Sequence, residues 1–166
     1  SEGRNLEVVE HVAEAVRQTP RVKLIDYSSD ADHNRSVLTY LGEPEAVLAA
    51  SQAMARKAFE LIDMSRHQGA HPRLGAVDVA PFIPVRNVEV VEAIEISRRF
   101  GRFVGELGVP VYYYRESATR PERYDLPAIR KGQYEALPEK LKDLAVWQPD
   151  EGPASFNAKA GAMVTG

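Results

Sequence analysis

Four side chains that could do chemistry are clustered in residues 61–84, which read LIDMSRHQGAHPRLGAVDVAPFIP. They are the imidazoles of His67 and His71 and the guanidinium groups of Arg66 and Arg73. An imidazole can transfer a proton near neutral pH, and a guanidinium offers two parallel donors to one carboxylate. The combination is typical of a loop site that binds an anion and moves a proton.

His71 is the candidate acid or base. It precedes Pro72, which pushes the backbone of the histidine into the extended region, outside a helix. With Arg73 two residues further on, it belongs to a cationic turn suited to an anionic ligand. The alternative is that His71 caps the C-terminus of the preceding helix, where a positive charge is favourable. Sequence chemistry alone leaves both interpretations open.

A metal site is the weaker hypothesis for the same turn. His67 and His71 are four residues apart, which would place both on one face of a helix. However, Gly69 and Pro72 argue against an unbroken helix, and no glutamate stands where a zinc-protease motif requires one. We therefore predict no metal site here.

Arg73 and two further residues, Arg35 and Asp78, could contribute to binding. Arg35 and Arg73 are candidate carboxylate clamps, although each could equally be a surface or salt-bridged arginine. Val77 and Val79 flank Asp78 in a strand-like run, so the period of two sends Asp78 to the face opposite the valines. We expect that face of the sheet to be open and polar.

A loop near the end of the chain could wrap a flat heterocycle with backbone groups and one aromatic ring. Its residues are Gly152, Pro153, Ala154, Ser155, Phe156, Asn157, Ala158, Lys159, Ala160 and Gly161. It lacks the residue spacing of a phosphate-binding loop, so the pattern by itself predicts only a loop. No GxSxG, GxGxxG or cysteine nucleophile favours another chemistry.

Helical and strand-like segments alternate along the chain. We predict a helix that begins after Asn5 and ends before Pro20, because asparagine caps helices and proline ends them. Further helices are expected over 44–64, 88–107, 126–131 and 134–144, strands over 22–26, 34–42, 76–83, 111–114 and 161–164, and loops over 27–33 and 147–153. Few of these helices could form full crossovers, so we predict an α+β fold with one mixed sheet and helices on one face.

Composition narrows the class of protein. The 166 residues suit one domain, and the net charge of −3 comes without a basic stripe, so we expect no nucleic-acid partner. The chain has no cysteine, which excludes disulfides and cysteine-ligated metal centres. Nothing resembles a signal peptide or a membrane span, so we expect a cytoplasmic protein without a membrane partner. The first residue, Ser1, is not methionine, and we expect a fragment.

Six segments carry a resemblance to a known family. They are SEGRN, DADHNRSV, IDMSRHQGAHPRLGAVDVAPFIPV, VPVYYY, LPAIRKGQYEALPEKL and WQPDEGPASF. In this order they resemble the formiminotransferase N-terminal subdomain, which occurs in glutamate formimidoyltransferase and in formimidoyltransferase-cyclodeaminase. The resemblance covers essentially the whole chain, residues 1–166, and the central segment is the most specific part.

The resemblance implies a function in histidine degradation. The formimino group of N-formimino-L-glutamate is transferred to N5 of tetrahydrofolate, without a metal, and His71 matches the catalytic histidine of the family. The loop 152–161 matches the folate-contacting loop. Arg35 and Arg73 as carboxylate ligands, and Asp78 as the group that orients a base or an amidine nitrogen, are hypotheses from charge and facing.

The same resemblance implies a ferredoxin-like two-layer sandwich that packs, sheet against sheet, on a C-terminal subdomain. The chain lacks that subdomain and the strand that precedes Ser1-Glu2-Gly3 in the family. We expect a homo-oligomer, because an uncovered apolar sheet face promotes self-association. The alternative function is a non-catalytic half that folds with, or binds, a partner through its exposed sheet face.

Overall fold

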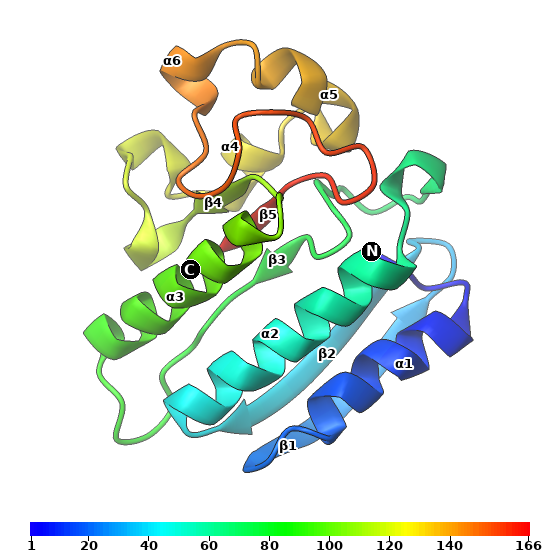
Figure 1. Ribbon diagram of the computed structural model, residues 1–166, viewed down its shortest axis with the longest axis vertical. Helices are drawn as coiled ribbons and strands as arrows, with labels where there is room; N and C mark the ends of the chain where they lie inside the picture. The colour runs from blue at the N-terminus through cyan, green and yellow to red at the C-terminus, as the bar shows by residue number, and fades with distance from the viewer.

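Three long helices lie side by side over one side of the strands in the computed structural model, which describes residues 1–166 (Figure 1). They are α1 (Leu6–Arg17), α2 (Pro44–Leu61) and α3 (Val90–Glu106). The side chain of Asn5 caps α1, as predicted, by accepting a hydrogen bond from the backbone of Val8. The inner stripes of the three helices meet in the main hydrophobic core.

The strands form two sheets. One is an antiparallel hairpin of β1 (Val22–Asp30) and β2 (Arg35–Gly42). The other is parallel, in the order β3-β5-β4, with β3 (Val79–Ala80), β5 (Met163–Thr165) and β4 (Val111–Tyr113). The α+β fold with long helices on one face is confirmed. The strands do not form the single sheet that we expected, because no backbone ladder joins β2 to β3.

The parallel sheet is covered on its second face as well. Two short helices, α4 (Leu126–Arg130) and α5 (Gln133–Lys140), pack there, and α6 (Leu144–Trp147) follows them. Ile129 and Leu137 of these helices join a second buried cluster with residues of β4 and β5. Burial on both faces is usual for parallel strands, and it means that only the β1–β2 hairpin has an open face.

Two predicted strands have other boundaries, and the helix predicted over 134–144 ends at Lys140. β1 runs on to Asp30, although residues 27–33 were predicted as a loop, because Tyr27 to Asp30 pair with the first half of β2. The hairpin reverses at Asn34, which has a positive φ of 50°. β3 keeps only two residues of the predicted strand 76–83, since just Val79 and Ala80 find a partner on β5. None of the helices is both long and apolar enough to cross a membrane.

Candidate active site

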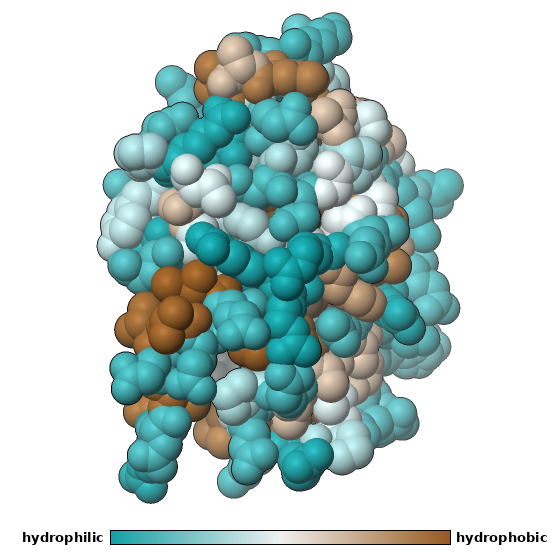
Figure 2. Space-filling model, turned by 60° about the vertical axis from the view of Figure 1, so that its left-hand side comes forward, coloured by the Kyte–Doolittle hydropathy of each residue, from teal (hydrophilic) through white to brown (hydrophobic).

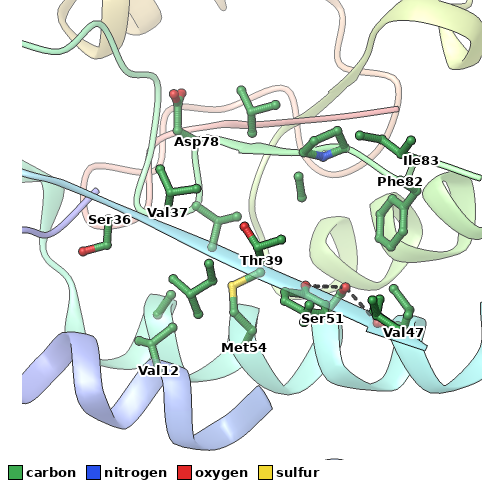
Figure 3. A pocket seen from close by; sticks show the side chains of 18 of the residues that line it. Val12, Ser36, Val37, Thr39, Val47, Ser51, Met54, Asp78, Phe82 and Ile83 are labelled. Carbon is green, nitrogen blue, oxygen red and sulfur yellow. Dashed lines mark hydrogen bonds between the residues drawn. The ribbon is translucent and has the colours of Figure 1, made fainter. Parts of the chain in front are cut away.

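A cavity of about 950 Å³ separates β2 from the segment that contains β3. It is lined by every residue from Arg35 to Gly42 and from Ala76 to Arg86, so it runs along the main-chain edges of both strands. In the close-up, Val37 lies on the same side of β2 as Asp78, while Val12 and Met54 of the helices lie on the other (Figure 3). The cavity therefore extends from the helix layer to the outer side of the sheets.

The exposed outer rim of the molecule is partly apolar. Ile83 and Val85, in the segment between β3 and α3, are exposed by 75% and 87%. Figure 2 shows a small hollow in the surface with apolar residues on one side of it and polar residues on the other.

The polar end of the cavity contains Arg35, His71, Asp78 and Arg130, whereas most of the remaining lining is apolar. These four residues come from β2, from the irregular turn after α2, from the residue before β3, and from the last residue of α4. Of the residues that the sequence singled out, the structure brings Arg35, His71 and Asp78 together. We call this group of four residues the polar cluster.

His71 lies ten positions beyond the last residue of α2, Leu61, in a turn without helix or strand. It therefore does not cap that helix, and the capping interpretation was wrong. Its ring meets the ring of His33 edge to face, with the centroids 6.3 Å apart. Partial burial, and after it the charges of Arg35 and Arg130, lower the pKa of His71 below its usual 6.5. At neutral pH the imidazole is thus unprotonated and able to accept a proton.

Asp78 does not lie on an open face, because α4 covers it. Its carboxylate accepts a hydrogen bond from the backbone of Leu74 at 2.8 Å and forms an ion pair with the guanidinium of Arg130. The side chains of Asp78 and Arg130 are only 13% and 19% exposed. Asp78 thereby ties the turn that carries His71 to α4.

Arg130 is the member of the polar cluster that the sequence analysis missed. The helical pattern of LPAIRK placed it at the end of a helix, but it gave no reason to bring that helix to Asp78, which is 52 residues away. The only sequence signal for Arg130 was its place directly after Ile129, an apolar residue that the structure shows to be buried.

Arg73 lies outside the cavity. Its side chain is 6% exposed, and its guanidinium donates two hydrogen bonds to the carboxylate of Glu135, at 2.7 and 2.8 Å. Its Nε donates to Nδ1 of His67 at 3.0 Å, and Nη1 donates to Gln133. Because these donors are engaged by the protein, the structure gives Arg73 a structural place and leaves its predicted substrate contact without support.

His67 is the buried neighbour of Arg73. Because its Nδ1 accepts from the arginine, its Nε2 carries the proton and donates to the backbone oxygen of Asn34, 3.0 Å away. Burial lowers the pKa of His67, so that this neutral form is favoured in the folded protein. No group of three or more His, Cys, Asp or Glu side chains is arranged to hold a metal.

The loop 152–161 is also outside the cavity. Lys159 donates to the backbone oxygen of Glu60 at the end of α2, and the ring of Phe156 packs on Tyr134 with the centroids 5.4 Å apart. Asn157 braces the loop internally by accepting from the backbone of Ala160 at 3.0 Å. The loop is thus an ordered surface beside α5, and its role in folate binding stays a prediction.

The structure is an α+β sandwich in which an imidazole of lowered pKa and two arginines line the polar end of one cavity. Comparison with known proteins identifies its family. All of residues 1–166 match the model of the formiminotransferase domain, N-terminal subdomain. The chain belongs to this family.

Named relatives match the chain over its whole length. It is 52% identical to formimidoyltransferase-cyclodeaminase of Mus musculus, of which it covers 31%. It is 43% identical to glutamate formimidoyltransferase of Streptococcus pyogenes, of which it covers 56%, and 43% identical to that of Thermoplasma acidophilum, of which it covers 55%. The chain thus spans between just under a third and just over a half of the length of these relatives.

Proposed function

We propose that the chain is the N-terminal half of a glutamate formimidoyltransferase, with His71 as the general base. The observation that carries the proposal is the half-buried imidazole of His71, which lines the polar end of the cavity with Arg35 and Arg130 and whose pKa burial and these two charges lower. Relatives at 43% identity bear the name of this enzyme.

The chemistry needs a base with a pKa near or below neutral. N5 of tetrahydrofolate attacks the formimino carbon of N-formimino-L-glutamate, which gives a tetrahedral intermediate. N5 loses its proton to the imidazole of His71, and the protonated imidazole returns a proton to the departing nitrogen as the bond to glutamate breaks. Such proton transfer contributes about 10²–10⁴-fold to a rate. Both substrates carry carboxylates, for which arginine is a suitable partner.

The substrates bind at the polar end of the cavity. The apolar remainder is part of the packing between strands and helices. Two strand edges without a ladder face each other across it, and the apolar stripes of α1 and α2 form its floor. The amino group of Ser1 donates to Ala76 at 2.7 Å, and the hydroxyl of Ser36 donates to Glu2, so these residues bridge the two sheets.

The second candidate function is a non-catalytic half that binds a partner through its open sheet face. Ile25, Val37 and Leu41 on the β1–β2 hairpin are each about half exposed, which favours a covered interface in the complete protein. Calorimetry with tetrahydrofolate on this chain alone separates the two candidates. Detectable binding of tetrahydrofolate supports the substrate-binding half, whereas the absence of binding supports the non-catalytic half.

The direct test is turnover by the full-length protein that contains this chain. With tetrahydrofolate and N-formimino-L-glutamate, we expect glutamate release and the formation of 5-formimino-tetrahydrofolate in equal amounts. Omitting either substrate should abolish both signals. Release of glutamate without modification of the folate, or no turnover, would contradict the proposed function.

A further inference from the structure

Arg130 uses only a small part of its hydrogen-bonding capacity within the protein. Asp78 engages one terminal nitrogen, Nη2, of the guanidinium. The Nε–H group is buried and has no hydrogen-bond partner. A buried donor without a partner costs free energy unless a ligand or water satisfies it, and Arg130 lines the cavity at its polar end.

Arg123 shows what a purely structural arginine looks like in the same fold. Its Nε also lacks a partner, but Nη1 donates to Asp150, and Nη2 donates to the backbone oxygens of Val146 and Gln148. Arg123 does not line the cavity. An unpartnered Nε alone is therefore no indication of a site. Arg130 differs because it opens on the cavity beside an imidazole.

The charges at the polar end do not cancel. Arg35 reaches the cavity from β2 without an acidic partner, and Arg130 shares only Asp78. Within the polar cluster, two guanidinium groups thus face the one carboxylate of Asp78, next to the imidazole of His71, while Glu2, which also lines the cavity, accepts hydrogen bonds from the backbone of Arg4 and Asn5. A partly buried surplus of positive charge attracts an anion more strongly than an exposed one does, because solvent screens it less.

We propose that Arg130 binds a carboxylate of the amino-acid donor through the guanidinium N–H groups that Asp78 leaves free, while Asp78 holds Nη2 in position. The inference rests on the proposed function, because it names the residue that recognises the donor. Arg35 is placed to take the other carboxylate. The ligand class is a dicarboxylic amino acid with a substituted amino group, and Arg130, not Arg73, is the second arginine of the site.

Titration of the full-length protein with L-glutamate, the product, tests this binding without any turnover. In R130K the lysine keeps the charge beside Asp78 but loses the parallel donors of the fork, so we expect the affinity to fall about tenfold. R99Q is the matched control, since Arg99 binds the carboxylate of Glu45 on the helix surface, outside the cavity. Equal affinity of R130K and wild type, or an equal loss in R99Q, would overturn the proposal.

Donors with one carboxylate converted to an amide give the second readout. If Arg130 binds that carboxylate, the loss of kcat/KM in R130K should disappear with one of the two monoamides of N-formimino-L-glutamate. The KM for tetrahydrofolate should stay at its wild-type value. The same loss with the parent donor and with both monoamides would contradict the assignment. Absence of turnover in the wild type would refute the proposed function, whereas the glutamate titration would still decide the role of Arg130.

Discussion

His67 and His71 share one turn, but their hydrogen bonds give them different chemistry. Both ring nitrogens of His67 are engaged, one by Arg73 and one by Asn34, so its tautomer is fixed and its proton has no route to a ligand. His71 lines the cavity and is surrounded by charged groups of other elements. Two histidines that look equivalent in the sequence therefore have a structural and a chemical role.

The buried His67 makes stability depend on pH. Its pKa is lowered in the folded state, so its contribution to the free energy of unfolding is complete above the unfolded value of about 6.5 and is lost as the pH falls through the lower folded value. We expect urea unfolding at pH 7.5 and 5.5 to show a smaller loss in H67Q, whose amide can accept from Arg73 and donate to Asn34 without titrating.

Two other groups act in the same direction. His71 has a lowered pKa, and burial lowers the pKa of the Ser1 amino group to about 6. The contribution of His71 is present in both H67Q and the wild type, whereas that of the Ser1 amino group is coupled to His67, because their charges interact. An identical dependence on pH in the two proteins would show that His67 is not the sensitive group.

Arg73 distinguishes a structural from a binding role. R73M leaves Nδ1 and the backbone oxygen of the buried His67 without their donor, whereas Glu135 is exposed and can be solvated, so we expect a loss of about 1–3 kcal/mol in the free energy of unfolding. R73K should recover part of this stability and leave the KM for the donor unchanged in the full-length protein. A raised KM with unchanged stability would instead place Arg73 in the binding site, as the sequence suggested.

At the scale of elements, local patterns predicted most of the segments that position the site. Asn5 and Pro20 delimited α1, and the alternation in residues 34–42 predicted β2, with Leu38 and Tyr40 facing the helices. The packing of α4 on the sheet could not be predicted, because it depends on the fit of Ile129 into the second cluster rather than on periodicity. That packing covers Asp78 and brings Arg130 to the cavity. It therefore explains both why the sequence did not indicate Arg130 and why the open sheet face predicted for Asp78 was wrong.

The turn that contains His71 is followed by Gly75, where the backbone of residues 160–162 packs closely against the chain. A Cβ at this position would lie 2.3 Å from the backbone oxygen of Ala162 and 2.6 Å from that of Ala160. We expect G75A to lower the free energy of unfolding by about 2–4 kcal/mol, since the contacting atoms are backbone.

G108A is the matched control. Gly108 has a φ of +88° but open space around its Cβ position, so only the backbone strain of about 1–2 kcal/mol applies. A smaller loss in G75A than in G108A, measured by thermal unfolding, would show that the approach at Gly75 is not tight.

At the scale of the whole molecule, the sequence predicted the layers but not the division of the strands. The cavity lies between β2 and β3, whose main-chain edges face each other without a backbone ladder. Because no backbone ladder joins the two sheets, the two halves of the domain are held together by the helix layer, in which α2 lies between α1 and α3 (Figure 1), and by hydrogen bonds such as those from Ser1 to Ala76 and from Ser36 to Glu2. The polar cluster draws its residues from both halves, so its geometry depends on that layer.

The most direct measurement is the pH dependence of turnover by H71A in the full-length protein. We expect kcat to fall about 10²–10⁴-fold, with the affinity for tetrahydrofolate unchanged. The acid limb of the wild-type profile, which protonation of His71 produces below about pH 6.5, should be absent from H71A. H33A is the control, because His33 touches the same ring from outside the cavity. Turnover of H71A close to the wild-type rate, or an equal loss in H33A, would contradict His71 as the base.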